Sequence, residues 1–370
     1  MTEKRIAFLF VEAGYGHIMP MQAALEAMPN DIQELDIEER YFFHQTDALK
    51  NVEKSFIHAV KQHNKIKGVG TLQYTLLKFF PQKLALDFLF KRKYKKAYND
   101  AIQQLIDLDA DVIFHSHFST LYYACEAKAK GLIKSKNIVY VPDPIVGLQW
   151  DRRADLFIVS DPLESKLHKS LPLKKIPFLL RKEVYQYTFS KVTYRDKLMI
   201  PKDKFTITLV DGAYGAGKLK KTIYALLDSD KPMTIIAVCG KNNTLYDELN
   251  DIKTKDNITL KVFGFTDKIL LLNAASDLFI GKAGASTLQE AKALNVPAII
   301  NYCASPLEHW IKDLHVTNGN AIYIPYVSSI VTEVESYIDG NEKYLEMKKH
   351  CHMGSKNPHQ ELKQLILTHE

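Results

Sequence analysis

Three glycine-rich turns, each directly after an apolar run, contain the residues of this chain whose types and spacing could do chemistry. They are Gly14-Tyr15-Gly16-His17, Gly212 to Lys218 and Gly281 to Thr287. Glycines let a backbone approach a ligand closely, and the start of a following helix offers unpaired N–H groups that bind anions. For the first turn, a lone G-x-G, a tight turn without a ligand is an equal alternative. We therefore predict up to three anion-binding turns.

The second turn, Gly212-Ala213-Tyr214-Gly215-Ala216-Gly217-Lys218, fits the beginning of a Walker A phosphate loop. The next residue is Leu219, whereas a Walker A site needs a Ser or Thr hydroxyl there to hold magnesium. A P-loop kinase or ATPase is therefore disfavoured. What remains is a glycine-rich cradle for an anion, with Gly212 and Gly215 as candidate binding residues.

The third turn reads Gly281-Lys282-Ala283-Gly284-Ala285-Ser286-Thr287 and leads to Glu290. Ser286 or Thr287 is predicted to cap a helix whose N–H groups receive a diphosphate, and Glu290 is close enough to reach ribose hydroxyls. A capping box, in which Ser or Thr is followed by an acid, would also explain the end of this motif. It does not explain the glycines that precede it.

The elements that must position these turns are strands and helices in alternation. Apolar, β-branched runs alternate with amphipathic stretches, which predicts an α/β protein of two doubly wound units. The predicted strands are 5–11, 32–37, 111–115, 137–141, 156–159, 175–178, 205–210, 233–238, 258–262, 278–280, 298–300 and 321–324. In such sheets, ligands bind beyond the carboxyl ends of the strands, which is where the three turns are expected.

The same alternation predicts the domain boundaries. An N-terminal domain spans 1–180, a polar segment at 181–201 is the linker, a C-terminal domain spans 202–340, and charged helical sequence follows at 341–370. The four cysteines lack the paired spacing of zinc sites, which favours a reduced cytoplasmic protein. No run reaches the ~18 apolar residues of a membrane-spanning helix, so we expect any contact with a bilayer to be peripheral.

Positive charge is concentrated in one segment. Residues 65–97 hold nine Lys or Arg and a single Asp, so the net positive charge of this segment is larger than the +6 of the whole chain. Aromatic residues interleave with these cations, as expected for an interfacial helix on anionic lipid. A solvated helix face is the alternative, and nucleic-acid binding is disfavoured because no readout motif accompanies the charge. The candidate membrane residues are Phe79, Phe80, Phe88, Lys91, Arg92, Lys93, Lys95 and Lys96.

Taken in order, these motifs resemble the GT-B glycosyltransferases that act on membrane lipids. These are the diacylglycerol glucosyl- and galactosyltransferases and the transferase that adds N-acetylglucosamine to the lipid-linked peptidoglycan precursor. Gly14 to His17 is similar to the family's N-terminal glycine element, and 111–117 to a strand that ends in histidine. Val141-Pro142-Asp143 with Trp150 resembles the end of the N-terminal sheet. Gly284 to Glu290 is the most specific match, since the family places donor phosphates and ribose there.

The resemblance implies two Rossmann-like domains that face a cleft. It also implies inverting transfer of a sugar from a UDP-sugar to a lipid or lipid-linked acceptor at the cytoplasmic face of the membrane, with no metal and no cofactor besides the donor. The implied donor-binding residues are Gly16, Gly212, Gly215, Phe263, Phe265, Gly284, Ala285, Ser286, Thr287, Glu290 and Glu308. His17 is the first choice as base, with His117 and Asp143 as alternatives, because all three follow N-terminal strands. Trp150 joins the membrane and acceptor residues.

Two departures from the family bear on activity. Relatives carry a histidine where this chain has Gly147, and a G-Q-E element where it has Pro306-Leu307-Glu308. A non-catalytic nucleotide-sugar-binding partner and a sugar-nucleotide epimerase of the same fold are therefore alternatives. The D-x-D triplets that begin at Asp107, Asp109 and Asp228 are a mark of metal-dependent GT-A enzymes. They follow no convincing strand, and the two-unit layout favours GT-B.

Overall fold

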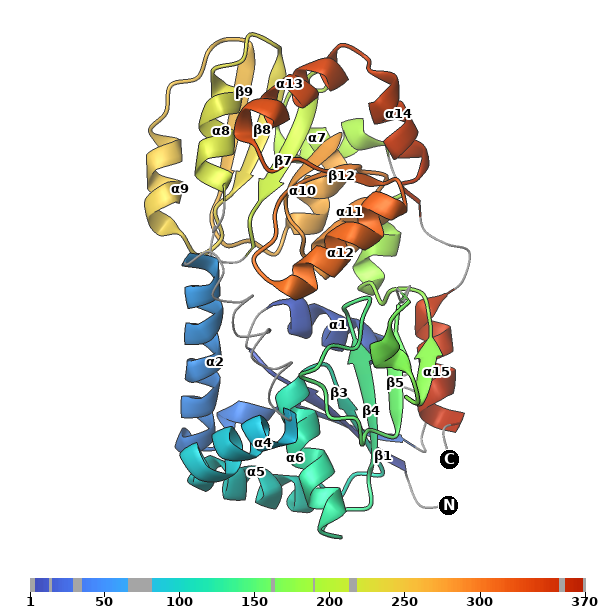
Figure 1. Cartoon of the computed structure of the whole chain (residues 1–370). Helices are drawn as coiled ribbons and strands as arrows, with labels where there is room; N and C mark the ends of the chain where they lie inside the picture. Colours follow the sequence, from blue (N-terminus) through green and yellow to red (C-terminus); the bar gives the residue numbers. More distant parts are fainter. Residues whose placement is uncertain are drawn as a thin grey trace. The chain divides into compact units, whose positions relative to one another are not determined.

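The chain folds into two units, each built on one parallel sheet. The computed structural model describes residues 4–12, 15–28, 35–65, 82–160, 164–188, 190–212, 218–352 and 357–368. Contacts divide the chain into a first unit, Met1–Arg181 with Ser355–Glu370, and a second unit, Lys182–Gly354. Each unit has a six-stranded sheet with helices beside it (Figure 1). The predicted α/β architecture of two doubly wound units is confirmed.

The first sheet has the strand order β2-β1-β3-β4-β5-β6. Its strands are β1 Lys4–Phe10, β2 Leu35–Tyr41, β3 Val112–His115, β4 Lys136–Val141, β5 Leu156–Val159 and β6 Leu173–Lys175. Four of them match the predicted ranges within one residue, while β2 and β6 are displaced. β2 is an edge strand that continues through Glu38, Glu39 and Arg40, and these polar residues hid its second half from a search for apolar runs. β6 is the opposite edge strand and carries two exposed lysines.

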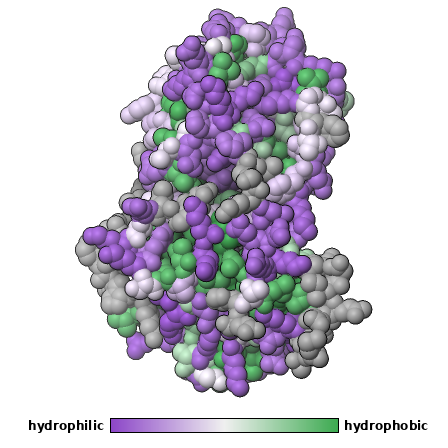
Figure 2. Space-filling model, turned by 90° about the vertical axis from the view of Figure 1, so that its right-hand side faces the viewer, coloured by the Kyte–Doolittle hydropathy of each residue, from purple (hydrophilic) through white to green (hydrophobic). Residues whose placement is uncertain are grey.

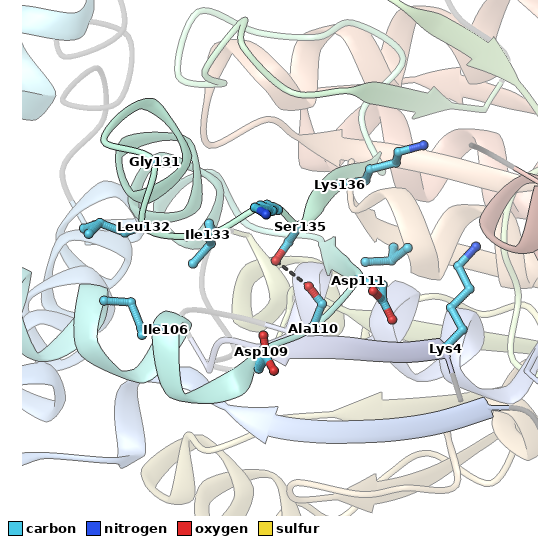
Figure 3. Close-up of a pocket in the computed structure, with 12 residues that line it drawn as sticks. Lys4, Ile106, Asp109, Ala110, Asp111, Gly131, Leu132, Ile133, Ser135 and Lys136 are labelled. Carbon is cyan, nitrogen blue, oxygen red and sulfur yellow. Dashed lines mark hydrogen bonds between the residues drawn. The ribbon is translucent and has the colours of Figure 1, made fainter. Parts of the chain in front are cut away.

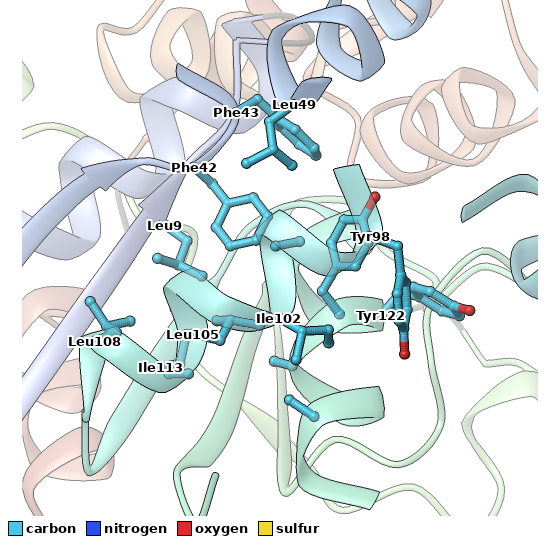
Figure 4. Packing of buried hydrophobic residues seen from close by; sticks show 14 of the residues in the cluster. Leu9, Phe42, Phe43, Leu49, Tyr98, Ile102, Leu105, Leu108, Ile113 and Tyr122 are labelled. Atoms are coloured by element: carbon cyan, nitrogen blue, oxygen red, sulfur yellow. The ribbon is translucent and has the colours of Figure 1, made fainter. Parts of the chain in front are cut away.

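Helices cover both faces of the first sheet. They are α1 Tyr15–Glu26, α2 Asp47–Lys65, α4 Gln82–Asp87, α5 Lys95–Leu108, α6 Phe118–Ala129 and α15 Pro358–Thr368, with a π-helix, η2, at Phe88–Lys93 and short 3₁₀ helices η1 Phe42–His44 and η3 Lys166–His168. Alternate residues of β1 point to opposite faces, so the sheet supports two cores. Leu9 packs with residues of α2, α5 and α6 such as Leu105 and Tyr122 (Figure 4). Phe8 packs on the other face with residues of α1 and α15.

The helix α15 belongs to the first unit although it comes last in the sequence (Figure 1). Ile366 is buried in the first unit's core, and Lys4 Nζ donates to the carbonyl oxygens of Ile366 and Leu367, at 3.4 and 3.1 Å. A cation at the carboxyl end of a helix satisfies carbonyls that lack a helical partner. The predicted helical segment 341–370 is thus shared, because α14, Glu342–Lys349, lies in the second unit.

The second sheet has the order β12-β11-β10-β7-β8-β9. Its strands are β7 Phe205–Val210, β8 Met233–Val238, β9 Ile258–Phe263, β10 Leu278–Lys282, β11 Ala298–Tyr302 and β12 Ala321–Tyr323. All six match the predicted ranges within two residues. Its other helices are α7 Lys191–Leu198, α8 Leu219–Leu227, α9 Asn243–Asn250, α10 Ile269–Ala275, α11 Ala285–Ala293, α12 Pro306–Thr317 and α13 Val327–Ile338, preceded by a 3₁₀ helix, η4 Lys182–Gln186. Inward residues such as Ile207 and Ile235 form the core under α8 and α13.

The segment 181–201, predicted to be the linker, is fastened to the second unit by α7. Arg195 is 6% exposed, and its Nη2 lies 2.5 Å from Asp277 Oδ2 while Nε donates to the Ala275 carbonyl at 3.0 Å. Lys191 Nζ lies 3.6 Å from the other oxygen of the same carboxylate. A half-buried carboxylate shared by two cations holds α7 against the end of α10.

Candidate functional site

Two strand ends of the first unit carry the predicted histidines. His17 lies in the first turn of α1, after β1, and His117 is the N-cap residue of α6, after β3. β1 and β3 are neighbours in a parallel sheet, so the residues that follow them meet at one edge. The ring centroids of His17 and His117 are 4.7 Å apart, and the rings meet edge to face at 86°. The structure thus brings together two of the three residues predicted as catalytic.

The backbone holds His17 in one tautomer. Its Nδ1 lies 2.6 Å from the carbonyl oxygen of Ser116, and Ser116 Oγ donates to the His17 carbonyl at 2.9 Å. Since a carbonyl only accepts, Nδ1 carries the hydrogen, and in the neutral ring Nε2 is left as a base. Burial lowers the pKa of His17 below 6.5, although the hydrogen bond to Ser116 opposes this. An imidazole that is neutral near pH 7 and can accept a proton at Nε2 fits a general base.

His117 is built into the start of α6. Its side chain is 3% exposed, and its Nδ1 accepts the N–H of Ser119 at 3.3 Å, with Ser119 Oγ at 2.6 Å. Burial, and then the neighbouring His17, hold the pKa of His117 well below 6.5. The rings of Phe56 and Phe118 lie 5.5 and 4.5 Å from its ring, centroid to centroid. These contacts describe a buried capping residue that packs against the ring of His17.

Asp143, the third predicted residue, follows β4, whose neighbour in the sheet is β3. It is 9% exposed. The segment after it contains Gly147, where the related enzymes are expected to carry a histidine. A Cβ atom at residue 147 would lie 2.3 Å from Gln149 Oε1, at the end of a flexible side chain. The space beside Gly147 is therefore filled by the Gln149 amide, which would have to turn away for any larger residue.

In the second unit, the amino end of α11 follows β10. Gly284 is the N-cap residue, and no described side chain caps the helix, which corrects the expectation that Ser286 or Thr287 does so. The first N–H groups of α11 thus lack a side-chain acceptor among the described residues, which suits an anion site. Ser286 Oγ is buried and has no hydrogen-bond partner in the described part of the chain. Glu290, in the second turn, is 4% exposed.

Lys282, the last residue of β10, forms an ion pair that no sequence motif indicated. Its Nζ lies 2.5 Å from Glu308 Oε1, and Glu308 Oε2 accepts the N–H of Ala304 at 2.6 Å. Burial lowers the pKa of Lys282, but the Glu308 carboxylate outweighs burial and the net shift is upward. Lys282 also lies over Gly212, whose φ is +75°, because a Cβ there would be 2.9 Å from Lys282 Cε. Glu308, predicted to bind the donor, is thus held by a lysine at the carboxyl edge of the sheet.

Asp211, after β7, closes the second glycine turn. Its Oδ2 accepts the N–H of Lys218 at 2.9 Å, so it joins the two ends of that turn. Asp211 is 2% exposed, and burial raises its pKa to about 7 against the lowering effects of this hydrogen bond and of Lys282. Gly215 lies outside the described residues. The sequence signal for Asp211 was an acidic residue between a strand and a glycine turn, and the sequence analysis did not single it out.

The remaining residues predicted to bind the donor lie at the ends of strands and the starts of helices. Phe263 is half-buried at the end of β9, and Phe265 follows it with 52% of its surface exposed and Lys241 Nζ at 5.3 Å from its ring centroid. Gly16 lies in the first turn of α1, and Ala285 is the first residue of α11. Their contacts with a nucleotide stay predictions.

The predicted membrane residues differ in their exposure. Phe79 and Phe80 lie outside the described residues. The exposed members on η2 and α5 are Phe88, Arg92, Lys93, Lys95 and Lys96. Leu84 of α4, which is 63% exposed, adds an apolar side chain beside Phe88, which is 62% exposed. Figure 2 shows the right-hand side of the molecule as it is seen in Figure 1. Most of that face is hydrophilic, with hydrophobic residues in patches between. No helix of the described residues is long and apolar enough to span a membrane.

Two other predicted membrane residues are less exposed: Lys91 is half-buried and ion-paired, and Trp150 is buried, which corrects its predicted place at the surface. Lys91 Nζ lies 2.9 Å from Asp87 Oδ1 and 2.5 Å from Glu126 Oε2, so two carboxylates compensate its charge. Trp150 is 1% exposed and packs in a core cluster with Phe157. A buried indole does not contact a membrane surface in this structure.

A cavity of about 660 Å³ opens at the opposite edge of the first sheet (Figure 3). Residues at the amino ends of β1, β3 and β4 line it, among them Lys4, Asp111 and Lys136. The D-x-D triplet at Asp109 lies here, and Asp111 Oδ2 accepts the N–H of Arg5 at 2.8 Å. Because this edge is the far end of the strands from His17, the triplet has no part in the candidate site.

The second half of the chain matches a known family model. Residues 206–364 match the glycosyltransferase family 28 C-terminal domain. The matched residues include Asp211, Lys282, Glu308 and the whole of α11. A processive diacylglycerol beta-glucosyltransferase of Bacillus cytotoxicus is 27% identical over 188 residues, which are 51% of this chain and 46% of that protein. The chain thus spans about half the length of this curated relative.

Two solved structures share the fold over nearly the whole chain. MurG of Acinetobacter baumannii has a TM-score of 0.65 and 15% identity, with 98% of this chain and 99% of that chain covered. A putative UDP-N-acetylglucosamine 2-epimerase of Listeria monocytogenes has a TM-score of 0.62 and 12% identity, with 100% and 97% covered. At these identities the likeness concerns the fold. With the family 28 domain, the predicted resemblance to GT-B glycosyltransferases that act on lipids is confirmed.

Proposed function

We propose that this protein is an inverting glycosyltransferase that moves a sugar from a UDP-sugar to a lipid or lipid-linked acceptor at the inner face of the cell membrane. The observation that carries the proposal is the His17 imidazole, which the Ser116 carbonyl holds with Nε2 as the basic atom. It occurs in a chain whose residues 206–364 match the family 28 C-terminal domain.

The chemistry assigned to His17 is proton removal. Nε2 takes the proton of an acceptor hydroxyl while the hydroxyl oxygen forms a bond to C1 of the sugar. The bond between C1 and the β-phosphate oxygen breaks, and its electron pair leaves with UDP. A single displacement of this kind inverts C1. Because burial lowers the pKa of His17, the ring is unprotonated near pH 7, as a base must be.

The second unit supplies the groups for the donor. The N–H groups at the start of α11 and the positive end of its dipole stabilise the charge that develops on the departing diphosphate. Glu290 is assigned to the ribose hydroxyls, and Phe263 and Phe265 to the base. The scheme needs no metal and no cofactor besides the donor.

The exposed side chains of η2 and α5 are assigned to the membrane. Phe88 and Leu84 offer exposed apolar side chains, and Arg92, Lys93, Lys95 and Lys96, which follow them along η2 and α5, add exposed positive charge. Such a surface binds the anionic lipids of a cytoplasmic leaflet, at about 1 kcal/mol for each cation near the lipid.

Donor binding is tested by calorimetry with UDP. Wild-type protein is expected to bind it, Glu290→Ala to lose binding, and the exposed control Asp230→Ala to keep it. A panel of UDP-sugars with and without lipid vesicles then separates three functions by UDP release and by analysis of the donor. A transferase releases UDP only with an acceptor, a non-catalytic partner binds UDP without turnover, and an epimerase changes the donor without any acceptor. Either of the last two outcomes would overturn the proposal.

The membrane surface is tested by sedimentation with phosphatidylglycerol vesicles. Replacing Lys93, Lys95 and Lys96 with Gln is expected to release most of the protein. The matched triple variant of Lys221, Lys253 and Lys268, exposed lysines of the second unit, is expected to sediment like wild type. Equal sedimentation of both triple variants would refute the assignment.

A further inference from the structure

The helix α2 contacts both segments that carry the predicted histidines. We infer that Glu53 and Phe56, which are three residues apart on one face of α2, position His17 and His117 for the reaction. The inference rests on the proposed function of His17 as a base. Neither residue stood out in the sequence, because both read as ordinary members of an amphipathic helix.

Glu53 fastens the chain where it leaves β1. Its side chain is buried, and Oε1 accepts the N–H of Glu12 at 2.8 Å. Oε2 lies 3.1 Å from Nε2 of His44, which follows β2. Glu12 is the last described residue before the glycine turn that leads into α1 and His17. A carboxylate with both oxygens engaged therefore ties α2 and the end of β2 to the start of that turn.

Phe56 lies one helical turn further along α2 and packs on His117. The centroids of the two rings are 5.5 Å apart, and His117 in turn meets His17 edge to face. The ring of Phe56 also lies 6.3 Å from that of Phe90, the buried residue of η2. Phe56 of α2 thus contacts both His117 and a buried residue two positions after the exposed Phe88.

Glu53, His44 and Glu12 are also residue types that bind metal ions. Ligand atoms of Glu12, His44 and Glu53 all lie within 4.8 Å of one another. The bonds described above already engage both oxygens of Glu53, so no orphaned atom points to an ion. The hydrogen bond from the Glu12 N–H to Glu53 holds the backbone, which a cation site at the surface would not require. We therefore infer that these three residues position the chain before His17 and do not bind a metal ion.

Kinetics of Glu53 variants test the inference. Glu53→Ala removes both bonds, and a displacement of His17 by about 1 Å is expected to lower kcat by about 100-fold with the UDP affinity unchanged. Glu53→Gln is expected to retain most of kcat, because the amide oxygen accepts the Glu12 N–H and the amide nitrogen donates to His44. Lys54→Ala, an exposed change on the same helix, serves as control. Equal losses for Gln and Ala, or no loss for Ala, would overturn the inference.

A second readout does not depend on turnover. In protein labelled with ¹⁵N-histidine, wild-type His17 is expected to titrate below pH 6.5 with hydrogen on Nδ1 in its neutral form. Glu53→Ala should move its pKa toward 6.5 and mix the tautomers. If wild type shows no turnover but this shift occurs, the proposed function fails and positioning stands. If turnover occurs and His17 does not respond, positioning fails. Should Glu53→Ala not fold, His44→Ala removes one partner of Glu53 and is expected to shift His17 in the same direction.

Discussion

The buried carboxyl of Asp211 makes the stability of the second unit depend on pH. Asp211 is 2% exposed, and its pKa is raised to about 7, chiefly by burial. In the unfolded chain an Asp has a pKa near 3.9. Between these two values the folded state binds more protons, so the free energy of unfolding falls as pH rises. We predict that Asp211→Asn, which cannot ionise, removes this dependence.

The size of the effect follows from the displacement of the pKa. A rise of about 3 units corresponds to at most about 4 kcal/mol, present in full below about pH 4 and lost by the time the pH passes 7. In Asp211→Asn the side-chain amide oxygen would still accept the N–H of Lys218, so the glycine turn keeps its closure. The variant is therefore expected to match wild type near pH 4 and to be more stable at pH 8 by about 2–4 kcal/mol.

Urea unfolding at several pH values between 4 and 8.5, followed by circular dichroism, measures this difference. Other titrating groups act equally on both proteins, so subtracting one curve from the other isolates residue 211. Asp230→Asn, whose side chain is 97% exposed, is the matched control and should show a flat difference. A flat difference for Asp211→Asn as well would refute the assignment of a raised pKa to burial.

Three further predictions concern charged groups. Lys282→Met leaves the Glu308 carboxylate, which is only 13% exposed, without its cation, and is expected to lower the free energy of unfolding by about 2–3 kcal/mol. Adding Glu308→Leu should recover most of this loss. Urea unfolding of both variants checks this, and an unchanged stability of the single variant would contradict it. The acid limb of the kcat/KM profile should lie below pH 6.5, because burial lowers the pKa of His17 and, among the described residues, the neutral ring of His117 and the Ser116 carbonyl face it. A limb above pH 6.5 would exclude His17 as the base. Lys91→Met should lower the free energy of unfolding by about 1–2 kcal/mol, because Lys91 neutralises Glu126. It should leave sedimentation with vesicles unchanged. Reduced sedimentation would show that Lys91 binds the membrane, as the sequence predicted.

The fold was predictable because its central strands are buried on both faces. Runs such as 205–210 and 233–238 consist of apolar residues and threonine, and the ends of both strands were predicted correctly. Edge strands break this rule. β2 continues through Glu38, Glu39 and Arg40 because, in the described part of the chain, no strand lies on one side of it, and a search for apolar runs stops too early there.

The site was predictable where a motif ends a strand, and not where a partner comes from elsewhere. His17 and His117 follow neighbouring parallel strands, so their proximity follows from the topology. The pairing of Lys91 with Glu126 depends on how α6 packs, and the burial of Trp150 depends on a loop after β4. A pattern of cations and aromatics records exposure only on average, so it could not separate these two residues from their exposed neighbours. Glu53 is a similar case, because its role rests on a hydrogen bond to a residue 41 positions away.

The most direct test of the central claim is UDP release from UDP-sugars in the presence of phosphatidylglycerol vesicles that contain diacylglycerol or a lipid extract, for wild type and His17→Ala. We expect release that requires the lipid acceptor. In His17→Ala we expect kcat to fall by about 10²- to 10⁴-fold, the usual contribution of a general base, with UDP affinity unchanged. Acceptor-dependent release that is equally fast in His17→Ala would contradict the assigned base. UDP binding without release for any donor and lipid would contradict the claim that the protein is a transferase.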